Sequence, residues 1–322
     1  MLVAEIETTG GPEAIKVVDR PTPAPGPGEI LIRQKAIGLN FIDTYFRSGL
    51  YPAPTPLVLG SEGSGVVEAV GAGVTRFKIG DRAAYAGGNG AYAEARIYKA
   101  DRAVHVPGGI SDEIAAVVML KGMTAEYLLH RCFKVQPGHD VLIHAAAGGA
   151  GGFLVQWARA LGARVIGTAG SQDKADLARR FGAHDVILYR QEDVAQRVKA
   201  LTDGRGVDVV YDSVGKDTFD GSLASLKRRG WMVSFGNASG PAPPVDTLRL
   251  MRGGSLFLTR PSLVDYIATT EELDASAAAV FAAIRSGALT PMIGQRFFLR
   301  DVADAHRALE GRDTVGATVL LP

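Results

Sequence analysis

A glycine-rich turn that follows a short apolar run constrains the fold of this chain more than any other feature. Residues 138–151 read GHDVLIHAAAGGAG, so a strand-like segment leads directly into Gly148, Gly149 and Gly151. Apolar residues after the turn recur at helical spacing, which predicts a helix that begins there. The N-terminus of a helix binds a diphosphate through its backbone N–H groups, and residues without side chains let the backbone approach the ligand. The turn therefore predicts a dinucleotide site.

The segment after the turn alternates apolar runs with amphipathic stretches, as expected of a parallel sheet with helices on both faces. With the strand before the turn, the pattern predicts six strands, the number in a complete doubly wound dinucleotide-binding domain. Gly182 and Gly230 are expected to end helices, because glycine readily adopts the left-handed conformation common at that position. The expected strands are 163–169, 185–189, 207–214, 231–236 and 255–260, and the expected helices are 174–181, 193–201 and 218–226.

The two ends of the chain differ in residue pattern from this central part. Near the N-terminus, short runs rich in β-branched and aromatic residues are separated by Gly and Pro, which predicts an irregular β domain. Near the C-terminus the sequence predicts two helices and a final strand that pairs with the N-terminal domain. The fold class is therefore α/β with an added β domain. The expected N-terminal strands are 29–36, 64–70, 82–86 and 92–98, and the C-terminal elements are helices 271–286 and 301–310 and strand 317–321.

Composition excludes several classes of function. A chain of 322 residues with 47% hydrophobic and 21% charged residues is ordinary globular material, long enough for two domains. The net charge of +1 argues against nucleic acid as a partner. The one compact basic run, 227–229, is expected at a helix end, where cations suit the helix dipole. The sequence shows neither a secretion signal nor an apolar span of about 20 residues, so a soluble, cytoplasmic protein is expected.

Neither Cys132 nor His144 is expected to be a catalytic residue. Cys132 is the only cysteine, which excludes an internal disulfide and a thiolate zinc cluster. Its apolar helical surroundings predict a buried structural thiol. His144 is expected to be a hydrogen-bonded core residue in the first strand of the dinucleotide domain. A Ser/His/Asp arrangement or a carboxylate pair that would indicate hydrolysis is not evident.

Several longer motifs carry a resemblance to a known family. They are residues 38–45 (GLNFIDTY), 211–215 (YDSVG), 234–237 (SFGN) and 259–263 (TRPSL), together with the glycine turn. Over essentially its whole length the chain resembles the zinc-independent NADPH:quinone oxidoreductases, or zeta-crystallin-like proteins, of the medium-chain dehydrogenase/reductase superfamily. The resemblance implies a GroES-like catalytic domain at 1–122, a Rossmann NADPH-binding domain at 123–262, and a C-terminal return to the catalytic domain at 263–322.

Charge at the end of the second strand indicates the cofactor. Sites that prefer NAD usually carry Asp or Glu there, about 20 residues beyond the glycine turn. Here Gly170 and Ser171 leave room and Lys174 offers a positive charge, while the side chain of Asp173 can point away on the first turn of a helix. A carboxylate at the tip would repel a 2′-phosphate, so its absence predicts NADPH.

The resemblance extends this cofactor site to other parts of the chain. It implies that Lys174, Tyr189 and Arg312 contact the 2′-phosphate, and that the nicotinamide lies where the two domains face each other. From the residues alone, Phe235 can equally be a core residue and Lys174 a solvated charge. The full set of expected cofactor-binding residues is Tyr127, Ala147, Gly148, Gly149, Ala150, Gly151, Gly170, Ser171, Lys174, Tyr189, Ser213, Phe235, Gly236, Asn237, Arg260, Pro261, Ser262 and Arg312.

The resemblance also predicts that no metal takes part. Zinc-dependent alcohol dehydrogenases of this superfamily have a metal-binding Cys where this chain has Asn40, and a metal-binding His where it has Ser61. Neither replacement supplies the thiolate or imidazole that holds a catalytic zinc ion. Glu62 remains, but one carboxylate does not form a tight zinc site.

The expected reaction is the reduction of a quinone by NADPH, with Asn40 and Tyr45 orienting the acceptor. Quinones accept electrons readily, so the reaction can proceed without a Lewis acid. One-electron and two-electron reduction both remain open, and Tyr45 can instead be an aromatic residue that covers a domain edge. A reductase of α,β-unsaturated aldehydes or ketones is the alternative enzyme, and an AU-rich RNA-binding or structural crystallin-like protein is the alternative of another class. The resemblance implies a homodimer through the last strand of the Rossmann sheet, and the apolar edge at 255–259 suits such pairing, although it can also be covered within one chain.

Overall fold

The computed structural model describes all 322 residues and divides the chain into two compact units. Unit 1 comprises Met1–Met123, Ile267–Ala282 and Pro291–Pro322, and unit 2 comprises Thr124–Tyr266 and Ala283–Thr290. Two helices cross the boundaries, α2 (Asp112–Tyr127) and α9 (Thr270–Arg285). Each unit has its own hydrophobic core.

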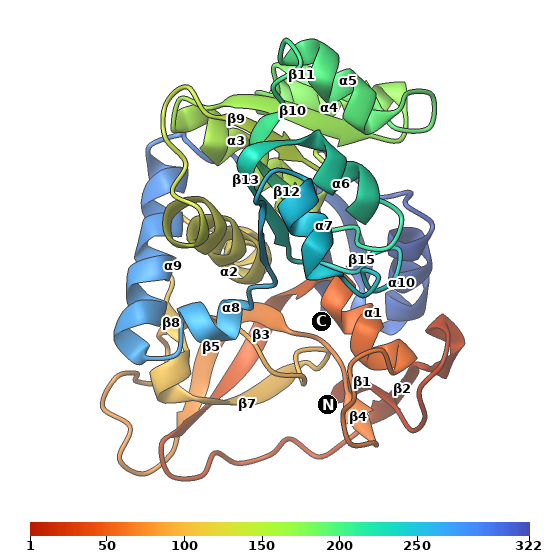
Figure 1. Ribbon diagram of the computed structural model, residues 1–322. Helices are drawn as coiled ribbons and strands as arrows, with labels where there is room; N and C mark the ends of the chain where they lie inside the picture. The colour runs from red at the N-terminus through yellow and green to blue at the C-terminus, as the bar shows by residue number, and fades with distance from the viewer. The chain divides into compact units, whose positions relative to one another are not determined.

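Unit 2 contains a six-stranded sheet in which every pairing is parallel (Figure 1). The strand order is β11-β10-β9-β12-β13-β14, so the chain starts in the middle, builds one half and then crosses back to build the other. This is the doubly wound order expected from the sequence. The strands are β9 (Asp140–Ile143), β10 (Arg164–Ala169), β11 (Asp185–Leu188), β12 (Val207–Asp212), β13 (Leu226–Ser234) and β14 (Phe257–Thr259).

The central strands of this sheet are buried along their length because helices cover both faces. All four residues of β9 are buried, and in β10 only Arg164 is partly exposed. The helical elements of unit 2 are the π-helical turn η3 (Leu128–Cys132), α3 (Gly149–Ala160), α4 (Gln172–Phe181), α5 (Val194–Leu201), α6 (Phe219–Ser225), α7 (Thr247–Arg252) and α8 (Leu263–Tyr266).

Two glycines expected to end helices behave differently. Gly182 ends α4 in the left-handed conformation at φ 110°, which confirms the first expectation. Gly230 lies inside β13, because α6 already ends at Ser225 and Leu226 is extended. The expectation for Gly230 was wrong, and so was the placement of the basic run 227–229 at a helix end. These basic residues belong to β13, where Lys227 forms an ion pair with Asp208 of the neighbouring strand β12.

Unit 1 is built mainly from antiparallel β structure, with β15 and β16 paired in parallel, and it includes the last strand of the chain. The final strand pairs antiparallel with β3, with Thr318 opposite Leu39. The expected strand 92–98 begins only at Ala95. Tyr92 lies in a bend before the strand, and its N–H donates to the carbonyl of Leu59. The elements are β1 (Leu2–Ile6), β2 (Lys16–Asp19), β3 (Glu29–Leu39), β4 (Leu57–Val58), β5 (Glu62–Val70), β6 (Arg82–Ala86), β7 (Ala95–Lys99), β8 (Val104–His105), β15 (Ile293–Phe298), β16 (Ala317–Leu321), α1 (Phe41–Ser48), α10 (Val302–Glu310), and the short turns η1 (Pro12–Ala14), η2 (Ala100–Arg102) and η4 (Leu299–Asp301).

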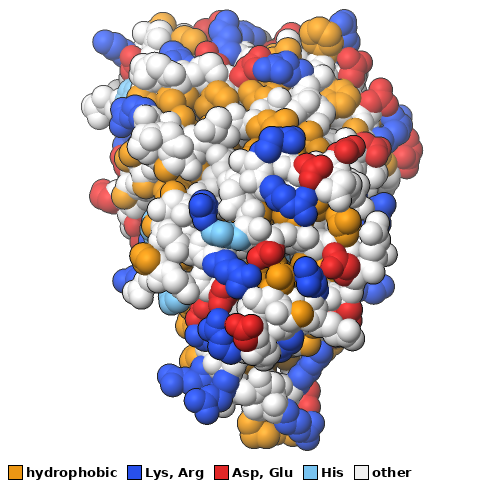
Figure 2. All heavy atoms as spheres, turned by 90° about the horizontal axis from the view of Figure 1, so that it is seen from above, with side chains coloured by type: hydrophobic (Ala, Val, Ile, Leu, Met, Phe, Trp, Pro, Cys, Tyr) orange, Lys and Arg blue, Asp and Glu red, His pale blue; other side chains and the backbone are white.

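The surface carries both signs of charge. On the face drawn in Figure 2, Lys and Arg side chains are largely interspersed with Asp and Glu. This distribution agrees with the net charge of +1. Among the helices, none has the combination of length and apolar composition that crossing a lipid bilayer requires.

A chain of buried polar groups links α1 to α10 inside unit 1. The Tyr92 hydroxyl lies 3.0 Å from Nε2 of His306, and Nη1 of Arg47 lies 2.9 Å from Nδ1 of the same ring. Arg47 is nearly fully buried and forms an ion pair with Glu310 at 2.6 Å. Because Arg47 can only donate, Nδ1 of His306 accepts and Nε2 carries the proton. Burial and the Arg47 guanidinium lower the pKa of His306 to about 3.

The lowered pKa predicts a specific loss of stability in acid. Unfolded His306 takes up a proton below its ordinary pKa of 6.5, whereas folded His306 stays neutral down to a pKa of about 3, so its contribution is complete above pH 6.5 and decreases below it. From pH 7 to pH 5 we expect the wild type to lose about 2 kcal/mol more of its unfolding free energy than His306→Gln loses. Urea unfolding at both pH values measures this difference.

Comparison with the variant is necessary because a second group acts in the opposite direction. Burial raises the pKa of Asp43 to about 6, so folded Asp43 takes up a proton between pH 6 and its ordinary pKa of 3.8, which adds stability as the pH falls. The wild-type curve alone therefore mixes two effects. An equal difference between wild type and His306→Gln at pH 7 and pH 5 would contradict the assignment.

Candidate functional site

The expected cofactor-binding residues of unit 2 gather at one edge of the sheet. Because all six strands are parallel, their carboxyl ends meet at the same edge, where ligands of doubly wound folds bind. Each strand is followed within a few residues by one of the expected groups. They are 147–151 after β9, Gly170, Ser171 and Lys174 after β10, Tyr189 after β11, Ser213 after β12, 235–237 after β13 and 260–262 after β14.

The glycine turn leaves the N-terminus of α3 open. Gly148 is the N-cap residue and makes no side-chain capping bond, so the first N–H groups of the helix are not satisfied by a side chain. A Cβ atom on Gly151 would lie 2.1 Å from the carbonyl oxygen of Ala145, which is closer than any real contact. Ala145 itself adopts a left-handed conformation at φ 50°. The backbone is therefore folded back tightly against the helix, and the geometry suits a bound diphosphate.

A second group of expected cofactor-binding residues follows β10. The Ser171 hydroxyl accepts a hydrogen bond from the N–H of Lys174 at 3.4 Å and caps α4, as the sequence predicts for a helix that starts near Ser171. A Cβ atom on Gly170 would lie 2.6 Å from the hydroxyl of Tyr189, so the Tyr189 side chain lies directly against Gly170. Ser171, Lys174 and Tyr189 thus come from adjoining strand ends. The acid nearest this group, Asp173, lies on the first turn of α4 and is exposed.

The loops after β12 and β13 are packed backbone to backbone. The Asp212 carboxylate accepts hydrogen bonds from the N–H groups of Val214 and Gly215 at 2.8 and 3.0 Å. A Cβ atom on Gly236 would lie 2.3 Å from the carbonyl oxygen of Ser213, which fixes Gly236 as glycine. Phe235 is only partly buried, so it is not simply a core residue. These contacts hold the expected nicotinamide-proximal residues in a defined arrangement.

Arg260 and Tyr127 are held by contacts within unit 2. Nη1 of Arg260 donates to the carbonyl of Ser234 at 3.1 Å. The ring of Tyr127 stacks on that of Tyr266, with centroids 4.3 Å apart. Tyr127 is nearly fully buried, and burial raises the pKa of its hydroxyl. Its phenol is therefore neutral at physiological pH and acts by packing or hydrogen bonding.

Cys132 is half-buried at the end of η3, rather than fully buried as the sequence predicts. The difference arises because η3 widens into a π-helical turn and then ends, so Cys132 does not lie within a regular packed helix. Burial raises the pKa of its thiol. A neutral thiol is a poor nucleophile, which supports the expected structural role.

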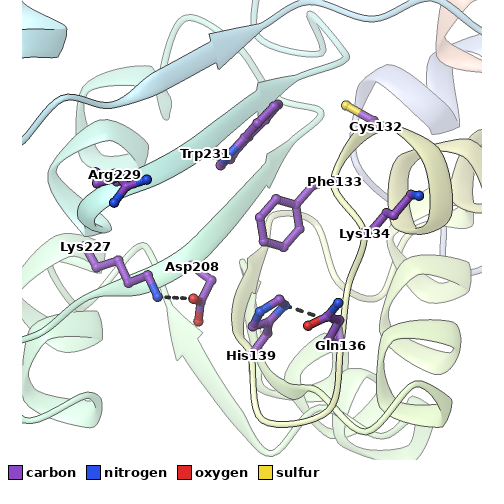
Figure 3. Close-up of a pocket in the computed structure, with 9 residues that line it drawn as sticks. All are labelled: Cys132, Phe133, Lys134, Gln136, His139, Asp208, Lys227, Arg229 and Trp231. Atoms are coloured by element: carbon purple, nitrogen blue, oxygen red, sulfur yellow. Dashed lines mark hydrogen bonds and ion pairs between the residues drawn. The ribbon is translucent and has the colours of Figure 1, made fainter.

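A separate hollow lies near the amino ends of the unit 2 strands. Its volume is about 380 Å³, and Figure 3 shows β12 and β13 on one side and the segment between η3 and β9 on the other. An ion pair between Lys227 and Asp208 lines it. Because the glycine turn lies at the carboxyl ends of the strands, this hollow is not part of the expected cofactor site. Its lining residues are Cys132, Phe133, Lys134, Gln136, His139, Asp208, Lys227, Arg229 and Trp231.

In unit 1, Asn40 belongs to a buried cluster around Glu62. Nδ2 of Asn40 donates to Oε1 of Glu62 at 2.9 Å, and Nζ of Lys121 donates to the same oxygen at 2.6 Å. The other carboxylate oxygen accepts the N–H of Leu120 at 2.7 Å. Glu62 is fully buried, so this ion pair neutralises a charge that would be costly alone. The Asn40 amide is therefore held in one orientation.

Ser61 and Tyr45 are positioned through Asp43. The Asp43 carboxylate accepts hydrogen bonds from the Ser61 hydroxyl at 2.5 Å, the Tyr92 hydroxyl at 2.8 Å and the N–H of Asn40 at 2.9 Å. The last bond fixes the start of α1, the helix that carries Tyr45. Tyr45 is 7% exposed and lies edge-on to Tyr51, with ring centroids 5.2 Å apart.

Sequence reasoning missed most of this unit 1 cluster. Lys121, Tyr92 and His306 come from distant segments, and nothing in their local sequence indicates that they reach the same site. Asp43 could have been found, because an acid three residues after Asn40 is the pattern of a capping box. Throughout the chain, no group of three or more His, Cys, Asp or Glu side chains is arranged to hold a metal ion.

Arg312 is the one expected cofactor-binding residue outside unit 2. It follows the end of α10 and has a left-handed backbone conformation at φ 63°. Its contact with a 2′-phosphate therefore stays a prediction, as do the roles of Asn40 and Tyr45 toward an acceptor.

Known proteins match both units of the chain. Residues 26–137 match the family model of the alcohol dehydrogenase GroES-like domain, and residues 149–282 match that of the zinc-binding dehydrogenases. A quinone oxidoreductase from Pseudomonas aeruginosa is 54% identical over 315 residues, which span 97% of each chain. A 2-haloacrylate reductase from a Burkholderia species is 45% identical over 331 residues and spans 100% of this chain and 99% of its own.

Solved structures agree with the sequence matches. The crystal structure of Escherichia coli quinone oxidoreductase in complex with NADPH has a TM-score of 0.98 and 47% identity, and the match covers the whole of both chains. The expected GroES-like domain combined with a Rossmann domain is thereby confirmed. Similarity of this extent, in sequence and in fold, shows that the chain belongs to the quinone oxidoreductase family of the medium-chain dehydrogenases/reductases.

Proposed function

We propose that this protein uses NADPH to reduce quinones without a catalytic metal. One observation carries the proposal: an open helix N-terminus and a corner with a lysine but no acid at its tip lie at the same edge of the unit 2 sheet. The first suits a diphosphate, and the second suits the extra phosphate that distinguishes NADPH from NADH. In this proposal residues 1–122 form the catalytic domain, 123–262 the NADPH-binding domain and 263–322 the return segment.

The residues present fit the cofactor. At the corner, Lys174 supplies positive charge and Ser171 a hydroxyl, while Gly170 keeps the space free of a Cβ atom. Arg312 is proposed to add a second positive charge. The related Escherichia coli enzyme has been solved in complex with NADPH, which supports the same cofactor here.

The roles of the chain's residues follow from this assignment. NADPH supplies a hydride equivalent from its nicotinamide ring. The N–H groups at the start of α3 hold the diphosphate, and 235–237 together with 260–262 flank the nicotinamide. Asn40 and Tyr45 orient the acceptor oxygen, with the amide of Asn40 fixed in turn by Glu62. Positioning of the two reactants then supplies much of the rate, because the acceptor is intrinsically reactive.

The donor set around Asn40 supports a metal-free reaction. An amide and a hydroxyl stand where zinc enzymes of the superfamily have a thiolate and an imidazole. The remaining carboxylate, Glu62, is already paired with Lys121, and Ser61 donates to Asp43. Groups that are neutral, or already paired with another side chain, do not provide the anionic and imidazole ligands that zinc requires.

An α,β-unsaturated acceptor is the second candidate substrate class. The 2-haloacrylate reductase relative, at 45% identity over nearly its full length, favours it. Both substrate classes need the same cofactor and differ only in the acceptor. Direct comparison of turnover is therefore the test of the proposed specificity.

We expect NADPH oxidation to be faster with a small quinone than with a haloacrylate or an enone, and to be unaffected by a metal chelator. Tyr45→Phe and Asn40→Ala should lower kcat/KM for the quinone by about 10-fold each, because each removes a polar group that orients the acceptor. Steady-state absorbance at the NADPH band measures turnover, and a binding titration measures the Kd for NADPH.

Serine replacement of an exposed tyrosine, Tyr189→Ser, is the matched comparison, since Tyr189 is assigned to the cofactor and not to the acceptor. This variant should raise the Kd for NADPH, whereas the Tyr45 and Asn40 variants should not. Unchanged quinone turnover in both Tyr45→Phe and Asn40→Ala would contradict the proposal that these residues orient the acceptor. Loss of activity on chelation would contradict the metal-free reaction.

We further propose that two copies pair through β14. This strand lies at the edge of the unit 2 sheet, so its outer backbone groups have no strand partner in the chain. Phe257 is 45% exposed, and its ring stacks on Trp231 with centroids 4.9 Å apart. An apolar sheet edge of this kind can be extended by an identical strand around a two-fold axis.

Phe257→Lys should convert the dimer to a monomer, because a charged side chain on an edge strand opposes pairing. Light scattering coupled to size-exclusion chromatography gives the mass directly. The control is Met251→Lys on α7, which is also exposed in unit 2 but lies off the edge strand. A dimer mass that survives Phe257→Lys but not Met251→Lys would place the interface elsewhere.

A further inference from the structure

His144 is fully enclosed between three strand ends of unit 2. It follows the last residue of β9 and is 2% exposed, which confirms the expected hydrogen-bonded core position. Nδ1 lies 3.1 Å from the hydroxyl of Thr168 in β10, and Nε2 lies 2.9 Å from the hydroxyl of Ser222 in α6. Both ring nitrogens are therefore used. The proposed reaction assigns no role to this residue.

The direction of each hydrogen bond follows from the last group in the series. Ser222 donates its hydroxyl proton to Oδ2 of Asp212 at 2.8 Å, because a carboxylate can only accept. The oxygen of Ser222 must then accept from Nε2 of His144, so Nδ1 is unprotonated and accepts from Thr168. Burial lowers the pKa of His144, which keeps the ring neutral in this arrangement.

The series joins the starts of three loops assigned to the cofactor. The Thr168 oxygen also accepts the N–H of Ala145 at 3.3 Å, and the Thr168 carbonyl accepts the N–H of Ala146 at 3.0 Å. Ala145 and Ala146 begin the glycine turn, and Thr168 lies two residues before Gly170. At the other end, Asp212 holds the loop after β12 through the N–H groups of Val214 and Gly215.

We propose that His144 is a positioning residue that sets the preference for NADPH over NADH by fixing the 2′-phosphate corner relative to the glycine turn. The inference rests on the proposed function, because it takes the corner after β10 as the 2′-phosphate site. Its content is new to that function: a buried residue that touches no ligand determines which cofactor is preferred.

The physical reason is the rigid spacing that the cofactor demands. The diphosphate and the 2′-phosphate belong to one molecule, so both are held well only if the two anion sites keep a fixed separation. The contact between His144 and Thr168 adds a side-chain hydrogen bond to the backbone bonds that already join the end of β10 to the end of β9. If that bond is lost, we expect the corner after β10 to shift relative to the turn, while the backbone pairing holds the sheet together. NADPH then loses its extra contacts, whereas NADH, which has no 2′-phosphate, loses little.

Binding titrations of NADPH and NADH to the full-length protein and its variants test the proposal. His144→Phe keeps a ring but removes both hydrogen bonds, and we expect the Kd for NADPH to rise about 10-fold and that for NADH by less than about 2-fold. Thr168→Val removes the partner hydroxyl in β10, which also accepts the N–H of Ala145, and it should raise the Kd for NADPH more than that for NADH. Ser225→Ala is the matched control, since Ser225 is a buried hydroxyl of α6 that bonds within its own helix at 2.7 Å.

Two conservative variants separate positioning from general support of the core. An Asn side chain can place its amide near the position of Nδ1, and a Gln side chain can place its amide near that of Nε2. His144→Asn should therefore keep the tie to Thr168 and retain the NADPH preference. His144→Gln should keep only the bond to Ser222 and lose that preference. A merely structural role would not distinguish between the two variants in this way.

The outcomes separate this inference from the proposed function. A wild-type protein that prefers NADPH, with variants that weaken both cofactors equally, would overturn the role of His144 and leave the cofactor assignment standing. A wild-type protein with no preference for NADPH would overturn the cofactor assignment itself. Selective loss in His144→Phe and Thr168→Val, with retention in His144→Asn, supports the proposal.

Discussion

The close approach of backbone to backbone at the glycine turn is the constraint on which the rest of unit 2 depends. A Cβ atom on Gly151 would collide with the Ala145 carbonyl, and one on Gly167 would lie 2.7 Å from the Cβ of Ala146. Because neither atom exists, α3 can begin directly above the end of β9, with β10 close beside it. The same absence of side chains that allows this packing leaves the helix N-terminus open to an anion. Fold and binding site therefore arise from a single steric requirement.

Hydrogen bonds between polar groups hold the closely packed segments in place, and the two units use these bonds differently. In unit 2, hydrogen bonds around Asp212 and His144 join strand ends, while no side chain caps the N-terminus of α3. In unit 1, the carboxylates of Glu62 and Asp43 are each saturated by donors. A saturated, neutralised cluster holds its neighbours in one orientation and has little capacity left for a metal ion. An uncapped helix N-terminus in unit 2 and fully hydrogen-bonded carboxylates in unit 1 agree with the proposal that a bound nicotinamide, and not a metal ion, supplies the reactive group.

Local sequence patterns predicted the elements of unit 2 well, since each depends on a short-range signal. Strand β10 is a continuous apolar run, and Ser171 and Gly182 mark both ends of α4. The failure at Gly230 has a clear cause: α6 already ends at Ser225, and Gly230 lies in the irregularity where the pairing of β13 with β12 jumps from Leu226 to Trp231. The cluster around Asp43 could not be predicted from the sequence, because Tyr92 and His306 join it from far along the chain. The residues that the sequence assigns to the cofactor lie together in unit 2 because each group follows a strand, and the carboxyl ends of parallel strands meet at one edge.

We expect the diphosphate of the cofactor to bind at the glycine turn, where no side chain blocks the backbone. The most direct test is the Kd for NADPH of Gly151→Ala, measured by titration beside the wild type and Gly108→Ala. A Cβ atom on Gly108 would meet nothing within 4 Å, so this position serves as the control. We expect affinity to fall by at least about 10-fold in Gly151→Ala and to be unchanged in Gly108→Ala. Equal affinity in all three proteins would contradict this expectation.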